Sequence, residues 1–303
     1  MSSSKVYLYA FISMTFWALS FVWYKEAFLS YGPVTVVFFR MVISVSILFL
    51  ILLFTGKKIL PAKSDFKWLF LISFFEPFCY FMGEGYGMLY VSPTTGAIII
   101  STVPLLTPVF LLFFGIKEKI SFANFFGIVV SFIGIIFVVT SDGTSLSASG
   151  KGVTLLFVAV VSAILFSIVL KKIGAKYNSI VIVFWQNLMA IFMFLPFFIA
   201  LELNSFINST HEAVSYTAIL KLGAFPSTIS FVLFIPVVTY LGAAKANTFT
   251  NLIPVVTAIF SFLFFGEEFG ITKVIGIFAV ITGLFISQIK ITNKKIEGVP
   301  VYE

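Results

Sequence analysis

The sequence predicts an all-α integral membrane protein with ten transmembrane helices, arranged as two inverted repeats of five helices. Three observations lead to this prediction. The chain of 303 residues is 60% hydrophobic and only 10% charged, with a mean hydropathy of +1.13, whereas about a quarter of the residues in a soluble domain are charged. Its apolar residues form ten runs, and features of the first five runs recur in the last five.

Each apolar run has about 17–25 residues, which is enough for a helix to cross a hydrocarbon core about 30 Å thick. Helices are expected because a helix satisfies its backbone hydrogen bonds internally, as a lipid surrounding requires. The expected spans are residues 6–24, 34–54, 66–90, 94–114, 121–140, 152–170, 178–201, 222–240, 244–265 and 270–290.

The chain divides at one polar linker, Ser141 to Lys151, which separates the fifth run from the sixth. We therefore expect a first repeat over residues 1–140, a second repeat over residues 152–290 and a cytoplasmic tail over residues 291–303. The first run is too long for the apolar core of a signal peptide, so we expect it to be retained as a span.

The lysines predict the orientation of the spans. If the N-terminus is cytoplasmic, 14 lysines fall in cytoplasmic segments and 4 in external ones. Cytoplasmic loops carry the excess of positive charge in membrane proteins, so both termini are expected on the cytoplasmic side, in a bacterial cytoplasmic membrane. The net charge of +7 thus reflects loop lysines, and no nucleic-acid partner is expected.

The repeat is most visible in two long apolar segments, Tyr90 to Glu118 and Tyr240 to Glu267, each with a proline near its centre. Five spans per repeat is an odd number, so the second repeat must lie inverted relative to the first. Inverted repeats place a substrate site near the bilayer midplane, between the halves. The matched positions are Ala18 with Ala163, Phe21 with Phe166, Pro104 with Pro254, Glu118 with Glu267, Gly127 with Gly276 and Gly134 with Gly283.

These paired features resemble the EamA family of the drug/metabolite transporter superfamily, over nearly the whole chain. The first copy departs from the usual adjacent Gly-Glu, because Gly115 and Glu118 are separated by two residues. The resemblance implies a ten-helix, inverted-repeat transporter with a central cavity, often an exporter of amino acids or other small metabolites. The residues that carry it are Pro104, Gly115-Ile116-Lys117-Glu118, Gly127 and Gly134 in the first half, and Pro254, Gly266-Glu267, Gly276 and Gly283 in the second.

Two carboxylates lie inside the third span, Glu76 and Glu84. A carboxylate at the centre of a membrane helix costs roughly 2.5–3.5 kcal/mol on insertion scales, so such residues usually face the bundle interior and mark function. With Tyr80 they stand at i, i+4 and i+8, which on a helix makes one stripe. We expect these three residues to contact substrate, with Glu76 and Glu84 as candidate proton carriers.

Arg40, the one arginine of the chain, lies in the second span at a depth similar to that of Glu84. A guanidinium can hold a carboxylate with two hydrogen bonds. Three readings stay open: a buried structural ion pair of Arg40 with Glu84, binding of a substrate carboxylate by Arg40, and proton uptake by a glutamate. Glu76 has no obvious cation and is the better candidate for the proton.

Other candidates come from neutral side chains. Asn247 and Asn251 are one helical turn apart, and either bond neighbouring helices or line the cavity. Trp17 either packs or forms an aromatic wall. Pro104 and Pro254 lack a backbone donor in mid-span, so we expect them to act as hinges.

The sequence thus predicts a secondary transporter that exports small amphiphilic metabolites such as amino acids by alternating access, with protons as a candidate coupling ion. The alternatives are an integral-membrane enzyme acting on a lipid-soluble substrate and a passive facilitator. The enzyme is disfavoured because no paired acidic metal motif and no nucleotide-binding motif occurs. We expect no catalytic residue, metal or cofactor. The single cysteine, Cys79, excludes an intrachain disulfide and a metal site made of several cysteines, and the single histidine, His211, lies in a polar loop. The expected partners are a small-molecule substrate and membrane lipid; the sequence leaves the substrate and the oligomeric state open.

Overall fold

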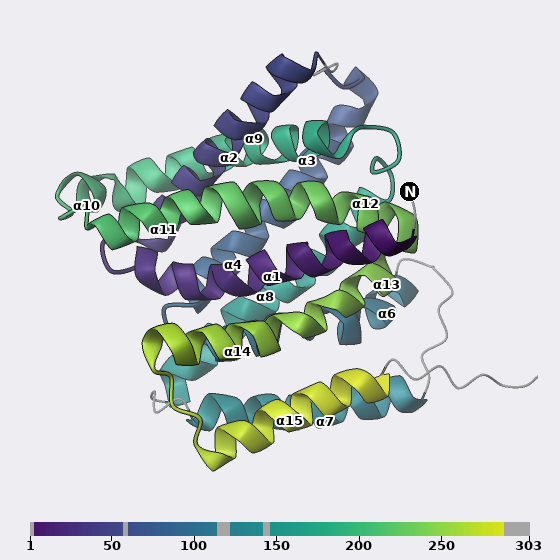
Figure 1. Cartoon of the computed structure of the whole chain (residues 1–303), viewed down its shortest axis with the longest axis vertical. Helices are drawn as coiled ribbons and strands as arrows, with labels where there is room; N and C mark the ends of the chain where they lie inside the picture. The colour runs from purple at the N-terminus through teal and green to yellow at the C-terminus, as the bar shows by residue number, and fades with distance from the viewer. Residues whose placement is uncertain (1–2, 57–59, 114–121, 142–145, 288–303) are drawn as a thin grey trace, which may run out of the picture.

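The computed structural model describes residues 3–56, 60–113, 122–141 and 146–287, in which every regular element is a helix (Figure 1). The expected tail, 291–303, and the motif residue Glu118 lie outside these ranges. The α-helices are α1 (Ser3–Ala27), α2 (Pro33–Thr55), α3 (Phe66–Ser73), α4 (Tyr80–Gly87), α5 (Pro93–Ile100), α6 (Val103–Phe113), α7 (Phe122–Ser141), α8 (Leu146–Leu170), α9 (Ser179–Phe197), α10 (Leu203–Ile207), α11 (Ala213–Ala224), α12 (Phe231–Leu241), α13 (Ala243–Asn247), α14 (Leu252–Phe265) and α15 (Ile271–Ser287).

Five short 3-10 or π-helical segments adjoin these helices; η1 leads into α3, and each of the other four joins two helices without a gap. They are η1 (Lys63–Asp65), η2 (Phe74–Cys79), η3 (Phe198–Glu202), η4 (Phe225–Ser230) and η5 (Thr248–Asn251). By length and composition, seven helices or joined runs of the described chain could cross a membrane: Ser4–Ala27, Pro33–Thr55, Pro93–Phe113, Gly150–Leu170, Ser179–Ile207, Ala213–Leu241 and Lys245–Phe265. Phe125–Ser141 and Ile271–Ile286 are shorter apolar helices.

Two of these runs are longer than expected, Ser179–Ile207 and Ala213–Leu241. The first span was expected to end just before Glu202, and the second to begin just after Lys221. Each charge has a partner in the fold. Glu202 accepts hydrogen bonds from the backbone N–H groups at the start of α2, and Lys221 pairs with Glu26 at 3.2 Å. The helices can therefore continue past these charges.

Helices α7 and α15 pack side by side and antiparallel (Figure 1). A Cβ atom on Gly134 would lie 2.7 Å from the Gly276 carbonyl oxygen, and one on Gly276 would lie 2.8 Å from that of Gly134. Such close backbone approach requires small residues. At the centre of the contact, the Ser131 hydroxyl donates to the Val280 carbonyl at 3.2 Å. Residues 131 and 280 are separated by 149, the offset of the glycine pairs, so this contact lies on a local two-fold axis.

The two halves also pack against each other elsewhere. Helix α1 packs against α11, η4 and α12 of the second half, and α8 packs against α3, η2 and α4 of the first half. The Ser13 hydroxyl donates to the Ser230 carbonyl at 3.0 Å, and the Ser230 hydroxyl donates back to the Ser13 carbonyl at 3.2 Å. The buried core therefore lies between the halves, while large side chains such as Phe54, Phe113 and Ile271 are exposed on the outside.

Matching prolines interrupt one helix in each half. Pro77 lies in η2 and Pro226 in η4, 149 residues apart, and both segments are π-helical. The backbone of Glu76 leaves the helical region, with φ −146° and ψ 116°. A proline disfavours helical geometry in the residue before it. The structure therefore differs from the expected continuous stripe of Glu76, Tyr80 and Glu84, because only Tyr80 and Glu84 belong to one regular helix.

The prolines expected to act as hinges follow interruptions of their own helices. Pro104 is the second residue of α6, which is separated from α5 by the turn at Ser101 and Thr102. Pro254 is the third residue of α14, directly after the 3-10 segment η5. A proline is tolerated in the first turn of a helix because its missing N–H would have no partner there. Both prolines thus stand where two helical pieces join.

Candidate functional site

A cavity of about 50 Å³ lies between the two halves. Its walls come from α1, α2, η2, α4, α5 and α6 of the first half and α8, α12, α13, η5 and α14 of the second. A water molecule needs about 10–15 Å³ on this scale, so the cavity has room for about three to five waters. A metabolite could bind here only after the walls move apart.

Six of the seven candidate substrate-binding residues named from the sequence line this cavity: Trp17, Arg40, Glu76, Tyr80, Glu84 and Asn247. Asn251 does not line it, and its Oδ1 is buried without a partner in the described chain. The reason is the 3-10 geometry of η5, which turns through three residues instead of 3.6. Four residues along such a segment, Asn251 no longer shares the face of Asn247.

Arg40 is buried, at 1% exposure, and binds hydroxyl groups. Its Nε donates to Ser227 Oγ at 2.7 Å and its Nη1 donates to the Tyr24 hydroxyl at 2.8 Å. Its Cζ lies 4.2 Å from the centre of the Phe81 ring, within the range of a cation–π contact. Arg40 also lies within the electrostatic reach of Glu84.

The direct ion pair considered for Arg40 and Glu84 does not form. Within the described residues, no carboxylate oxygen lies within 4.0 Å of the Arg40 guanidinium. The Tyr24 hydroxyl, which accepts from Arg40, also interacts with Glu84 and stands between the two charges. The sequence indicated the matched depth of the two residues, but it gave no sign that Tyr24 would separate them.

The two cavity carboxylates have few partners. Oε1 of Glu84 accepts a hydrogen bond from the Tyr80 hydroxyl at 2.9 Å, and Oε2 has no partner in the described chain although Glu84 is only 2% exposed. The Glu76 carboxylate is 7% exposed and forms no hydrogen bond or ion pair with a described residue. Buried polar atoms in proteins are nearly always hydrogen-bonded, so the fully buried Oε2 of Glu84 is a candidate for binding a ligand or a proton. The Glu76 carboxylate, which lines the same cavity without a hydrogen bond to a described residue, is a second candidate.

The broken helix of the second half is held by donors from three other helices. The Ser227 carbonyl accepts from the Ser44 hydroxyl and from Asn187 Nδ2, both at 3.1 Å. Trp17 Nε1 donates to the Pro226 carbonyl at 3.3 Å. In the first half, Gln186 Nε2 donates to the Glu76 carbonyl at 2.9 Å. Backbone groups freed by a helix break inside a membrane need such replacement partners.

Asn247 serves both of the roles that the sequence left open. Its Nδ2 donates to Thr107 Oγ1 at 3.3 Å and its Oδ1 accepts from the Ser167 hydroxyl at 3.3 Å, so it joins α13 to α6 and α8. It also lines the cavity. Sequence reasoning missed the cavity residues Phe81, Phe166 and Phe234; the match of Phe21 with Phe166 was the signal that could have identified one of them.

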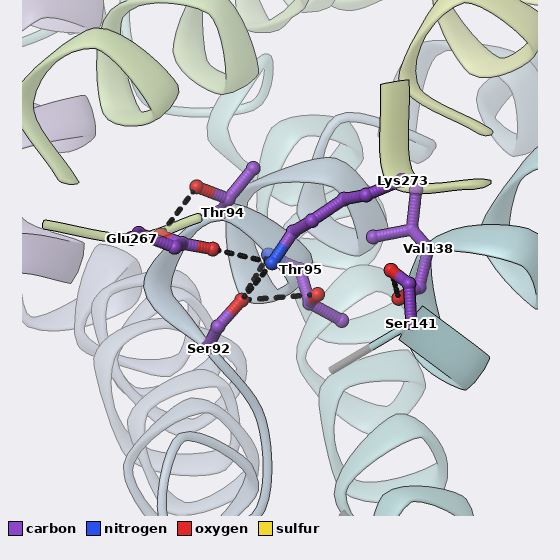
Figure 2. A network of polar contacts seen from close by, with 7 residues as sticks. All are labelled: Ser92, Thr94, Thr95, Val138, Ser141, Glu267 and Lys273. Carbon is purple, nitrogen blue, oxygen red and sulfur yellow. Dashed lines mark hydrogen bonds and ion pairs between the residues drawn. The ribbon is translucent and has the colours of Figure 1, made fainter. Parts of the chain in front are cut away.

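A second polar network lies away from the cavity (Figure 2). Lys273 Nζ contacts Glu267 Oε1 at 2.6 Å and Ser92 Oγ at 3.4 Å, and the Thr94 hydroxyl donates to Glu267 Oε2 at 2.8 Å. These bonds tie the start of α5 to α15 and to the segment between α14 and α15. Glu267 and Lys273 therefore neutralise each other at one end of the bundle.

A third group lies between η1 and the segment before α9. Asp65 accepts from Tyr177 at 2.7 Å and pairs with Lys176 at 3.1 Å. The bonds from Tyr177 and Lys176 lower the pKa of Asp65 below its usual value. No group of three or more His, Cys, Asp or Glu residues that could hold a metal ion occurs in the part of the chain that the structure describes.

Comparison with known proteins places these features in a family. Residues 4–140 and 150–288 each match the EamA-like transporter family. The chain is 30% identical over 265 residues to the uncharacterized transporter YetK of Bacillus subtilis, a match that covers 85% of this chain and 78% of that protein. It is 24% identical over 287 residues to an uncharacterized transporter of Archaeoglobus fulgidus, covering 93% and 98% of the two chains.

A solved crystal structure has the same fold. It superposes with a TM-score of 0.69, covers 95% of this chain and 97% of its own, and is 14% identical in sequence. At this level of identity the likeness concerns the fold alone.

Proposed function

We propose that this protein moves small amphiphilic metabolites through the central cavity by alternating access. The chain belongs to the EamA-like transporter family and is therefore an integral membrane transporter. One observation supports the proposal most directly. The cavity between the two halves is lined by two carboxylates, Glu76 and Glu84. Oε2 of Glu84 and both oxygens of Glu76 accept no hydrogen bond from a described residue. Apolar walls with a few convergent polar groups are typical of a small-molecule site.

The proposed architecture is ten transmembrane helices in two inverted repeats, over residues 1–140 and 152–290, with the tail 291–303 and both termini in the cytoplasm. Two observations support the inversion: the reciprocal contacts of α7 and α15, and the packing of α1 on the second half and of α8 on the first. The distribution of lysines supports the orientation in a cytoplasmic membrane. Two exposed positions at opposite ends of the bundle test it, Ala175 and Thr210.

In a Cys79→Ser background, Thr210→Cys should react with an impermeant thiol reagent in intact cells, and Ala175→Cys should react only after the membrane is opened. Labelling of Ala175→Cys in intact cells with protection of Thr210→Cys would reverse the proposed orientation.

We further propose that transport is export driven by proton exchange, with Glu76 as the proton carrier. The titratable and charged groups that face Glu76 are Glu84, Arg40 and Tyr80, while α9 contributes the neutral amide of Gln186. A proton or a substrate can each satisfy the Glu76 carboxylate, and competition between them would couple their movements. The hinges at Pro104 and Pro254 would let the walls of the cavity separate toward one side at a time.

Counterflow in proteoliposomes tests the proposed function. Vesicles containing the purified chain and loaded with unlabelled metabolites should take up the labelled form of a transported one, with saturation and with loss of uptake when the internal metabolite is removed. Uptake that shows no saturation and no dependence on internal metabolite would indicate a passive pore. No uptake of any member of a broad panel would contradict transport through this cavity.

A further inference from the structure

We propose that the cavity selects amphiphilic organic cations, with a protonated amine as the group that Glu76 and Glu84 bind. This inference rests on the proposed transport function and specifies its substrate class. Its basis is an imbalance of hydrogen-bonding groups in the cavity wall: the side-chain donors are already engaged within the protein, whereas carboxylate acceptors are not.

The neutral donors of the wall all bond to other protein groups. Trp17 Nε1 donates to the Pro226 carbonyl and the Ser20 hydroxyl donates to the Trp17 carbonyl. The Tyr80 hydroxyl donates to Glu84. The Ser167, Asn247 and Thr250 side chains donate to Asn247 Oδ1, Thr107 Oγ1 and the Asn247 carbonyl, respectively.

Arg40 is also largely engaged. Two of its three nitrogens donate to Ser227 and Tyr24, and Phe81 covers its face. Recognition of a carboxylate by arginine depends on two parallel N–H groups, and the edge that contains Nε is occupied by Ser227. A substrate carboxylate would also meet the two glutamates of the same cavity. The geometry therefore gives little support to binding of a substrate carboxylate by Arg40.

The carboxylate oxygens of the wall, unlike its donors, are largely without hydrogen-bond partners. Oε2 of Glu84 and the whole Glu76 carboxylate have no partner in the described chain. Two carboxylates face one guanidinium, so the ionised site has one surplus negative charge, which is costly in a buried place. A ligand with one positive charge and several N–H donors, as an alkylammonium has, would satisfy both the charge and the free oxygens.

The remaining wall suits the rest of such a ligand. Trp17, Phe21, Tyr80, Phe81, Phe166 and Phe234 line the cavity. Aromatic faces attract cations, and they also supply apolar surface for a hydrophobic substituent. No described lysine lines the cavity, so among the described residues of this wall only Arg40 repels a cation, and its Nε and Nη1 are bonded to Ser227 and Tyr24.

Three matched probes separate this inference from its alternatives: 2-phenylethylammonium, phenylalanine and 3-phenylpropanoate, which share a phenyl ring and differ in charge. Binding is measured by titration calorimetry on the purified full chain, and transport by counterflow. The amine should bind tightest and the carboxylate should not bind. Glu84→Gln and Glu76→Gln should each weaken binding of the amine by about tenfold to a hundredfold, as expected for loss of a hydrogen bond to a charged group.

Glu268→Gln is the matched control, because Glu268 is an exposed carboxylate outside the cavity. The Glu268→Gln protein should bind the amine as tightly as the unchanged protein does. Thermal unfolding of each variant verifies that it is folded. Tighter binding of phenylalanine or 3-phenylpropanoate than of the amine would overturn the inference and leave the transport function standing. Counterflow of some other metabolite without any binding of the amine would overturn it equally. Absence of counterflow for the whole panel would contradict the transport function itself.

Discussion

Glu267 and Glu84 are two carboxylates largely withdrawn from water, in different regions of the molecule. Glu267 has a lysine at 2.6 Å on one oxygen and a threonine hydroxyl at 2.8 Å on the other (Figure 2). Glu84 has one tyrosine hydroxyl at 2.9 Å, and its second oxygen has no described partner. Glu76, in the same cavity as Glu84, lacks even a hydroxyl partner among the described residues.

The carboxylates at the ends of the bundle resemble Glu267. Glu26 pairs with Lys221, Asp65 with Lys176, and Glu202 binds backbone amides of α2. The acids at the ends of the bundle therefore have a lysine or backbone amides as partners, whereas Glu84 in the cavity has only tyrosine hydroxyls as hydrogen-bond donors and Glu76 has no hydrogen bond with a described residue. Strained or unsatisfied groups of this kind are kept at functional sites at a cost in stability. The comparison predicts that the two kinds of carboxylate respond to substitution in opposite ways.

The largest loss of stability is expected from Glu267→Gln. It removes the carboxylate that lies 2.6 Å from Lys273, a lysine that is only 3% exposed, and removing one partner of a buried ion pair costs about 3 kcal/mol. Thermal unfolding of the purified variant measures the loss. The double variant Glu267→Gln with Lys273→Met should recover most of it, and an unchanged unfolding temperature in the single variant would show that the pair contributes nothing.

Arg40→Gln should destabilise the protein by about 2 kcal/mol, because it removes two buried hydrogen bonds and the contact with Phe81. Glu84→Gln should change stability by less than about 1 kcal/mol, since one of its oxygens has no partner to lose. If Arg40 and Glu84 were a tight pair instead, the two single variants would be equally unstable and the double variant would be close to the original protein. A double-mutant cycle on unfolding free energy decides between these outcomes.

Pro104→Ala and Pro254→Ala should leave the unfolding free energy within about 1 kcal/mol of the original, because both residues lie in the first turn of a helix. They should slow exchange across the membrane if the two junctions act as hinges. The rate of counterflow at saturating substrate measures this effect. Unchanged rates in both variants would remove the hinge proposal.

The smallest effect is expected at Asp65. Its hydrogen bonds with Tyr177 and Lys176 lower its pKa from the usual 3.8, so the ionised form stabilises the folded state. That contribution is complete above the pKa of the unfolded chain and is lost as the pH falls through the lower pKa of the folded protein. Asp65→Asn should remove this acid dependence, which unfolding curves between neutral and strongly acidic pH would reveal. Parallel curves for the two proteins would show that the Asp65 bonds add no stability.

The sequence was informative about composition and depth. Charges inside apolar spans singled out Arg40, Glu76 and Glu84, which lie at one cavity, and the duplicated prolines indicated where helices are interrupted. Rotation about helix axes could not be predicted. Pro77 breaks the helix at Glu76, and η5 turns Asn251 away from Asn247, because a local change of helical period redirects every later side chain.

The partners of the buried charges could not be predicted from the sequence either. The bonds of Arg40 with Tyr24 and Ser227 join residues 16 and 187 positions apart, and no local pattern predicts such pairs. Glu267 and Lys273 are only six positions apart in the sequence, yet their pairing depends on the path of the chain between α14 and α15. The sequence therefore identified the charged residues more readily than their partners.

The most direct test of the central claim compares transport with stability in three variants: Glu76→Gln, Glu84→Gln and Glu267→Gln with Lys273→Met. Proton-gradient-driven transport into proteoliposomes is measured with a transported substrate, and thermal unfolding is measured on the same preparations. The two cavity variants should keep the stability of the original protein and lose transport by at least about tenfold, whereas the end-of-bundle double variant should keep transport. Full gradient-driven transport by both cavity variants would contradict the account.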